Sequence, residues 1–259
     1  MMKRFKLLGC IIIVLLIFSF QANAEEITGK VLAQKIFDRD VGKNSISNAQ
    51  MLLVNKNGNT RTRLFINQRM KEGDFERQII RFTSPADIDG TGFLTIEKPG
   101  WETEQFLFLP ALRRTRRIVS SQKSHKFVNS DFTYEDMERH PVEDYTYKII
   151  GSKTIGNLDC YELETRPKKG IESQYSLVRS LVSKRSLVSV FVQYFDQKGR
   201  HIKTYKVLKL DQVQGIWTES TVSMEDLEKK HKTYIKLEKI TYNTDMDKDL
   251  ISRKSLENY

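Results

Sequence analysis

Two clusters of charged side chains are the densest candidates for chemistry in this sequence. The first consists of carboxylates, at Asp131, Glu135, Asp136 and Glu138. Paired carboxylates can transfer protons or bind calcium. They can also form the charged start of a short helix, where acidic residues suit the helix dipole. We favour the helix interpretation, and Thr133, three residues before Asp136, adds a weak helix-capping pattern.

The second cluster is the basic run from Arg113 to Arg117, interrupted only by Thr115. On a strand, Arg113 and Arg117 would share one face, and Arg114 and Arg116 the other. Such a run can protect a solvated strand at a sheet edge, or it can contact anionic lipid headgroups or an acidic partner. Both interpretations stay open. The candidates for headgroup or membrane contact are Arg113, Arg114, Arg116 and Arg117.

The other chemistry-bearing side chains have no spacing typical of a catalytic or metal site. The four histidines form no H-E-x-x-H or similar ligand pattern, and no G-x-S-x-G, Walker or G-x-G-x-x-G motif occurs. Cys160 has no base beside it, so we expect a buried, inert thiol. We therefore expect no catalytic residue, no metal site and no cofactor. The alternative is an enzyme of unrecognised type, whose catalytic residues would meet only in space.

Most of the chain has the residue pattern of β-strands. We therefore expect strands to position these side chains. Asn57-Gly58 predicts a two-residue hairpin turn, and Lys98-Pro99-Gly100 predicts a second turn. We expect about ten strands at the even spacing of an antiparallel barrel or sandwich. They fall near residues 49–56, 61–67, 75–82, 92–97, 104–109, 145–149, 161–165, 175–182, 187–195, 200–210, 216–224 and 233–242, some of them short.

One clear helix is expected near residue 28. Thr28 can cap it, Val31, Leu32 and Ile36 fall on one face, and it should end near Gly42. Its apolar surface is small, so it should pack over another element. Residues 245–250 are acidic, and we expect a loop there.

Several strands are apolar on both faces, so one face needs cover from a helix, a partner or a ligand. A half-closed sheet under a helical lid would form an apolar pocket. The sequence leaves open which strand face lines it. The candidates for a lipid-binding cavity are Phe93, Leu94, Ile96, Phe106, Phe108, Val190, Phe191 and Val192.

The first 24 residues have the pattern of a cleavable signal peptide. Lys3, Arg4 and Lys6 precede an apolar run, and Ala22-Asn23-Ala24 supplies the small residues of a cleavage site. Cys10 begins the apolar run, whereas a lipobox cysteine ends it, so we expect no N-terminal lipid. The exported chain would be one domain, residues 25–259. It carries a modest basic surplus, which in an exported protein favours anionic membrane surfaces over nucleic acid.

Three segments resemble the LolA-like outer membrane lipoprotein-sorting protein family, in that family's order. They are Pro85 to Leu94, Phe108 to Ile118 and the string Ser130-Asp131-Phe132-Thr133-Tyr134-Glu135-Asp136-Met137. Gly215-Ile216-Trp217 fits as well, whereas Phe127-Val128-Asn129 departs from the small and apolar residues expected before Ser130. The resemblance implies a mainly β fold: an incomplete, half-open antiparallel barrel, with an N-terminal helix and short helices covering its open side.

The resemblance also implies a periplasmic, non-enzymatic carrier for lipid or lipoprotein acyl chains. Its expected partners are those chains, an inner-membrane transporter and an anionic membrane surface, with no nucleic acid. The alternative is an accessory docking subunit of a transporter of the resistance–nodulation–division type, with a filled core and no lipid cargo.

Overall fold

The computed structural model describes residues 27–100 and 102–258, so the predicted signal peptide lies outside the described part. In that part, thirteen antiparallel strands form one sheet, in the order β6-β5-β4-β3-β2-β1-β13-β12-β11-β10-β9-β8-β7. Strands that lie side by side in the sheet are also neighbours in the sequence, except where β1 meets β13. The sheet does not close into a barrel, because β6 and β7 remain its edges. The predicted half-open barrel is therefore confirmed.

The strands are longer and more numerous than the sequence pattern predicted. Their bounds are β1 Asn44–Val54, β2 Thr60–Glu72, β3 Phe75–Ser84, β4 Gly92–Lys98, β5 Glu102–Leu109, β6 Arg114–Ile118, β7 Tyr145–Ile155, β8 Leu158–Pro167, β9 Tyr175–Ser183, β10 Ser189–Asp196, β11 His201–Val213, β12 Ile216–Asp226 and β13 His231–Tyr242.

The first hairpin is confirmed, but its turn is longer than two residues. The pairing of β1 with β2 ends at Val54 and Thr60, so the loop spans residues 55–59. The Asn55 side chain accepts hydrogen bonds from the backbone N–H groups of Asn57 and Asn59. Gly58 takes the left-handed conformation at φ 80° that closes the loop.

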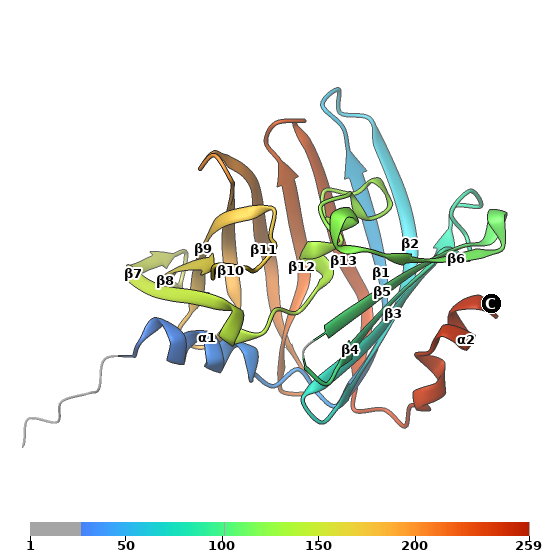
Figure 1. Ribbon diagram of the computed structural model, residues 1–259, viewed down its shortest axis with the longest axis horizontal. Helices are drawn as coiled ribbons and strands as arrows, with labels where there is room; N and C mark the ends of the chain where they lie inside the picture. Colours follow the sequence, from blue (N-terminus) through green and yellow to red (C-terminus); the bar gives the residue numbers. More distant parts are fainter. Residues whose placement is uncertain (1–26, 101, 259) are drawn as a thin grey trace, which may run out of the picture.

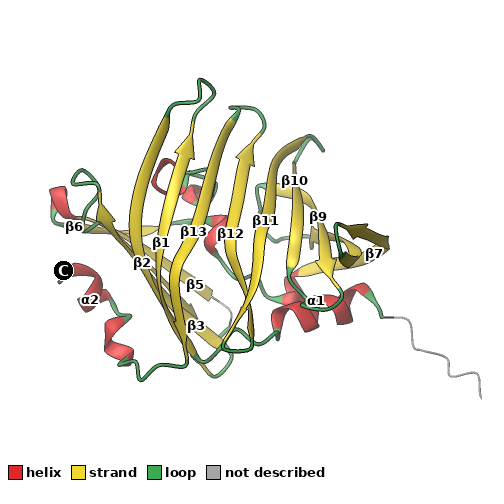
Figure 2. Ribbon diagram, turned by 180° about the vertical axis from the view of Figure 1, so that it is seen from behind, coloured by secondary structure: helices red, strands yellow, loops and turns green. Residues whose placement is uncertain are grey.

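The segment between the two edge strands, residues 119–144, fills one part of the concave side of the sheet. We call this segment the plug. It lies in front of the central strands in Figure 1 and behind them in Figure 2. Its short 3₁₀ helices include Phe127–Asn129, Glu135–Met137 and Val142–Asp144. These are the short helices expected over the open side of the barrel.

Aromatic packing holds the plug in the sheet. Phe127 is 1 % exposed, and its ring lies 4.9 Å from the ring of Phe93 and 6.0 Å from that of Phe82. Tyr134 packs against both Phe93 and Phe127, with ring centroids 5.6 and 6.1 Å away. Tilted aromatic pairs at these separations stabilise a core beyond the effect of buried area alone. The main core cluster therefore includes residues of both the plug and the concave face of the sheet.

Helix α1, Gly29–Phe37, covers the β7 end of the sheet (Figure 1). Thr28 caps it by accepting a hydrogen bond from the Val31 N–H at 3.3 Å, as predicted. The helix ends at Phe37 rather than near Gly42, and Val31 is 47 % exposed, so its predicted place on the packed face is wrong. The start of the helix lies against β7. A Cβ atom at Gly29 would lie 2.6 Å from the Tyr147 carbonyl carbon.

Helix α2, Arg253–Glu257, lies on the convex side of the sheet and follows the predicted loop at residues 245–250 (Figure 2). The sequence pattern did not indicate this helix. Ile251 and Leu256 are fully buried there against Ile79, Leu94 and Phe106. Arg81 donates hydrogen bonds to the carbonyl oxygens of the last helical turn. The second apolar face of these strands is thus covered by the chain itself.

Among the described residues, no helix is both long enough and apolar enough to cross a membrane.

Candidate functional site: a cavity of two adjoining chambers

The concave side of the sheet holds a chamber of about 450 Å³ beside the plug. The strand register explains its lining, because directly opposed residues of antiparallel strands share one face. One such row runs Tyr147, Thr165, Val178 and Tyr194 across β7 to β10. A second runs Ser180, Val192, Tyr205 and Met224 across β9 to β12. We call this the tyrosine chamber, after Tyr145, Tyr147, Tyr175, Tyr194 and Tyr205 in its wall.

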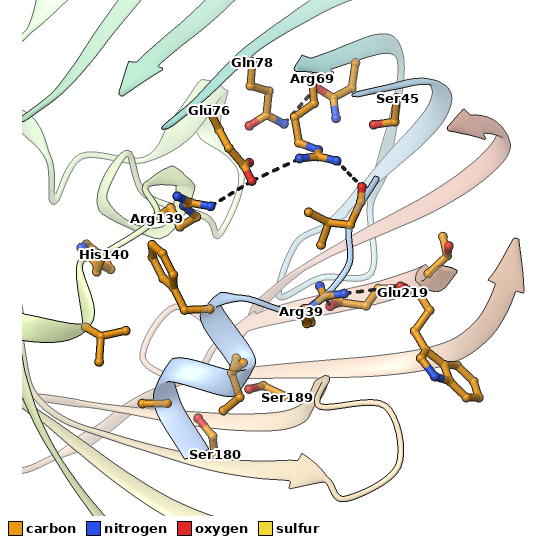
Figure 3. Close-up of a pocket in the computed structure, with 18 of the residues that line it drawn as sticks. Arg39, Ser45, Arg69, Glu76, Gln78, Arg139, His140, Ser180, Ser189 and Glu219 are labelled. Carbon is orange, nitrogen blue, oxygen red and sulfur yellow. Dashed lines mark hydrogen bonds and ion pairs between the residues drawn. The ribbon is translucent and has the colours of Figure 1, made fainter. Parts of the chain in front are cut away.

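A second chamber of about 650 Å³ lies between α1 and strands β1 to β3 and β13. Its wall includes a row formed by Tyr242, Ser45, Arg69 and Gln78, again cross-strand partners. We call it the arginine chamber, because Arg39, Arg69 and Arg139 all line it. Figure 3 shows these three side chains around the hollow.

Each arginine of this chamber is matched by a carboxylate. Arg39 lies 3.2 Å from Glu219, and Arg69 and Arg139 lie 3.2 and 3.0 Å from Glu76. Arg139 also approaches Glu97 at 3.2 Å. The dashed lines in Figure 3 show Glu76 between its two arginines. Paired in this way, the arginines supply polar surface without a large surplus of positive charge.

The two chambers adjoin, because they share wall residues. Six residues line both: His140, Tyr147, Thr165, Ser180, Ser189 and Glu219. All six have polar side chains, and they come from the plug, from β7 to β10 and from β12. We call this set the polar collar.

Burial keeps the tyrosine hydroxyls of this cavity protonated. It raises the pKa of Tyr147 to about 12, helped by the negative charges of Asp144 and Glu143. Burial likewise raises the pKa of Tyr194 far above its ordinary value, and Asp136 adds to the effect. The hydroxyls therefore act as neutral donors and acceptors over the whole physiological pH range.

The acidic cluster of the plug is structural. Thr133 and Asp136 form the predicted reciprocal pair, with the Thr133 N–H donating to the Asp136 carboxylate at 2.7 Å. Asp136 also accepts from the Tyr175 hydroxyl at 2.7 Å and pairs with Lys203. Glu135 accepts a hydrogen bond from the backbone of Gln174. The carboxylates thus bind the plug to the surrounding strands, which goes beyond the predicted role at a helix start.

The structure separates the predicted cavity residues between the two faces of the sheet. Val192 lines the tyrosine chamber. Phe93 also lies on the concave face, but the plug covers it. Val190 and Phe191 pack beside Cys160 and Leu181. Contact with lipid stays a prediction for these residues, and the geometry favours Val192.

The remaining four candidates lie on the convex face. Leu94 and Phe106 are buried against Ile251 and Leu256, with Ile96 and Phe108 packed at the margin of the same cluster. Phe108 also borders a surface hollow beside Arg113 and Arg114. These four residues therefore line neither chamber, because their strand parity turns them outward.

The basic run lies on the edge strand β6, as one of its two interpretations requires. Arg114 and Arg116 share a face of this strand, but Arg113 precedes it with φ 44°, so strand alternation does not extend to Arg113. Arg117 pairs with Glu102 and Glu104 at 3.1 Å. Within residues 27–100 and 102–258, Arg113, Arg114 and Arg116 make no ion pair. Leu112 beside them is 67 % exposed.

Cys160 is fully buried, as predicted, and burial raises the pKa of its thiol, which disfavours the reactive thiolate. In the described part of the chain, no group of three or more histidine, cysteine or acidic side chains could hold a metal ion.

Sequence reasoning missed most of the cavity wall. His140 belongs to no sequence motif, yet it lines both chambers. Tyr145 and Tyr147 alternate with Thr146 and Lys148, and that alternation was a usable signal for an inward face. Ser180 and Ser189 carried no signal, because a small hydroxyl in a strand does not indicate which face it occupies.

A curved antiparallel sheet with such a cavity on its concave side defines a class of half-barrel proteins, and comparison with known proteins places the chain within it. A family model described as "Uncharacterized protein" matches residues 74–258. A DUF1329 family protein from Desulfovibrio piger superposes with a TM-score of 0.84 at 29 % identity, covering 88 % of this chain and 97 % of the other. No curated protein matches the sequence.

A protein domain from Vibrio parahaemolyticus, described as an outer membrane lipoprotein-sorting protein domain, superposes with a TM-score of 0.83 at 27 % identity over 88 % of this chain and 98 % of the other. A LolA superfamily protein from Nitrosomonas europaea shares the fold, with a TM-score of 0.67 at 17 % identity over 88 % and 99 % of the two chains. The chain therefore belongs to the family whose model matches residues 74–258, and it shares the LolA-like fold with these lipoprotein-sorting neighbours, as the sequence resemblance implied.

Proposed function

We propose that this protein is a periplasmic, non-enzymatic carrier that holds acyl chains of lipid or lipoprotein inside its half-barrel. The observation that carries the proposal is the pair of adjoining chambers, of about 450 and 650 Å³, on the concave side of the sheet. These volumes fall in the range of small-molecule sites. A docking module with a filled core would not need this space.

The tyrosine chamber supplies the apolar wall that an acyl chain requires. Beside the tyrosine rings it includes Phe132, Met137, Val178, Val192 and Met224. Methionine side chains adapt to ligands of irregular shape. Burial of a hydrocarbon chain against such surface stabilises the complex by about 0.8 kcal/mol for each CH₂ group removed from water.

The segment from Leu112 to Val119, which contains the edge strand β6, suits a membrane surface, and we call it the tip. Leu112 is 67 % exposed beside Arg113 and Arg114, and Val119 at the far end of β6 is 51 % exposed. Unpaired arginines are attracted to anionic headgroups, and exposed apolar side chains can enter the interface. This tip would hold the carrier at a membrane while cargo is exchanged. The N-terminal signal-peptide pattern and the family's link to lipoprotein sorting support a periplasmic location.

The decisive experiment is mass spectrometry on protein purified from periplasm without detergent, compared before and after organic extraction. We expect bound lipid or acylated peptide in the native sample. Val178→Trp should obstruct the tyrosine chamber and reduce bound lipid several-fold. Val31→Trp, at a site that is 47 % exposed and outside both chambers, is the matched control and should leave loading unchanged, and thermal melting should show that both variants fold.

Two results would contradict the proposal: native protein without lipid, and failure of the same protein to take up a fluorescent fatty acid. They would favour the docking-subunit alternative, and the next experiment would be a crosslinking search for a membrane transporter.

A further inference from the structure

The polar collar is unusual for the wall of a lipid cavity, because most of its hydrogen-bonding groups are unused. Glu219 accepts from the Tyr205 hydroxyl and pairs with Arg39. For the other five members, no side-chain hydrogen bond to any described residue is formed. The His140 ring packs against the Tyr145 ring, with centroids 5.4 Å apart, and donates and accepts no hydrogen bond among the described residues. The free groups belong to His140, Tyr147, Thr165, Ser180 and Ser189.

These free groups are half-buried or buried, with Ser180 only 9 % exposed. Buried polar groups in proteins are nearly always hydrogen-bonded. The collar groups can meet that requirement only through water or a ligand, since they face the cavity. A ligand that is hydrocarbon along its whole length would displace the water and leave them without partners. A bound molecule therefore needs polar atoms at the level of the collar.

The charges on either side of the collar argue against an anionic head. In the arginine chamber, Arg39 and Arg69 already face Glu219 and Glu76. In the tyrosine chamber, Glu135 contributes a carboxylate without an ion pair to any described residue, and Asp136 and Glu138 pair with Lys203 and Lys123. A free carboxylate or phosphate would thus compete for paired arginines and lie near other acids. A neutral head with hydrogen-bond donors and acceptors faces neither this competition nor this repulsion.

We propose that the polar collar selects amphiphiles in which an acyl chain is joined to a neutral, hydrogen-bonding head through an ester or amide. The chain would lie in the tyrosine chamber, the ester or amide at the collar and the head in the arginine chamber, among the polar groups in Figure 3. This inference rests on the proposed carrier function and specifies the cargo class.

Three probes with the same chain length test the inference on the full mature chain: 1-monolauroylglycerol, laurate and dodecane. We expect the neutral glyceride to bind about tenfold more tightly than either of the others, the gain expected from one or two ligand hydrogen bonds. Dissociation constants can be measured by displacement of a fluorescent fatty acid below the aggregation concentration of each probe.

The variant Tyr147→Phe with Ser180→Ala removes two collar hydroxyls that have no protein hydrogen bond to lose, so it should fold normally. It should weaken the glyceride about tenfold and leave dodecane unchanged. Tyr161→Phe with Ser152→Ala makes the same chemical changes at residues outside both chambers, and it should alter neither affinity.

The outcomes separate the two proposals. Equal binding of glyceride and dodecane, with no effect of the collar variant, would overturn the collar inference and leave the carrier function standing. Tighter binding of laurate than of the glyceride would overturn the neutral-head assignment. Binding of none of the three probes would overturn the carrier function, and the collar inference with it.

Discussion

Thr233 and Asp131, 102 residues apart in the sequence, form a reciprocal pair of hydrogen bonds. The Thr233 hydroxyl donates to the Asp131 carboxylate at 2.7 Å and accepts from the Asp131 N–H at 2.9 Å. Both residues are almost completely buried. His231 and Lys126 approach the same carboxylate at 2.6 and 3.0 Å. This network joins the plug to β13 and so sets one wall of the cavity.

Thr233→Val keeps the shape of the side chain but removes both hydrogen bonds between this residue and Asp131. It should therefore destabilise the protein. We expect a loss of about 1–3 kcal/mol in the free energy of unfolding, measured by urea denaturation. Thr62→Val, at an exposed position on β2, is the control and should change it by less than about 0.5 kcal/mol. A similarly small effect at Thr233 would mean that the pair does not hold the plug.

The convex face gives a second prediction. Leu256 is fully buried between α2 and the sheet, whereas Leu250 in the preceding turn is 43 % exposed. Leu256→Ala should cost about 2–5 kcal/mol of stability through the lost contacts and the cavity left behind. Leu250→Ala should cost far less. Equal effects in chemical denaturation would show that α2 does not stabilise the convex face.

The sequence predicted most strands and turns because alternation and turn residues are local signals, whereas the half-open barrel was implied by the family resemblance. The helix cap at Thr28, the hairpins and the edge position of the basic run all follow from short-range patterns. Helix α2 escaped prediction, because five residues carry no helical periodicity. Its helical state depends on tertiary contacts of Leu256 and on Arg81, which bonds to its last carbonyl groups from β3.

The site was harder to predict, because the cavity depends on which strand parity faces inward. Phe93 and Leu94 are neighbours with similar apolar character, yet one faces the plug and the other faces α2. The direction in which the sheet curves decides between them, and no local pattern contains that information. The free hydroxyls of the collar are hidden for the same reason, since their importance appears only once the strands are in register.

The exposed tip at Leu112 leads to a prediction about membranes. Arg114→Glu with Arg116→Glu should strongly weaken binding to liposomes that contain anionic lipid, because two attractive charges become repulsive. Lys236→Glu with Lys239→Glu makes the same change in net charge on exposed positions of β13 and should have a much smaller effect. The difference should shrink at high salt. Equal effects in a liposome flotation assay would indicate a role for net charge alone, and no effect of either pair would remove the tip from the proposal.

Glu138 provides a prediction about pH. Its side chain is 5 % exposed and pairs with Lys123 at 2.9 Å, while its Oε1 atom is buried without a hydrogen bond. Burial raises the pKa of this carboxyl above the ordinary 4.5, and the Lys123 pair only partly offsets it. The folded protein thus holds this proton to a higher pH than the unfolded chain does. The contribution of Glu138 to stability should fall as the pH rises from about 4.5 to the folded-state pKa, and stay constant above it.

Glu138→Gln removes this titration, so the stability of the variant relative to the unmodified protein should rise across that pH window. Glu143→Gln is the control with the opposite sign, because the Lys30 pair lowers the pKa of that exposed carboxyl. Its relative stability should fall slightly as the pH rises through the range below 4.5, and the effect should be small in solvent. Urea midpoints of both variants and of the unmodified protein, measured between pH 3 and pH 8, would test both expectations. Parallel curves for Glu138→Gln and the unmodified protein would show that Glu138 titrates as it does in the unfolded chain.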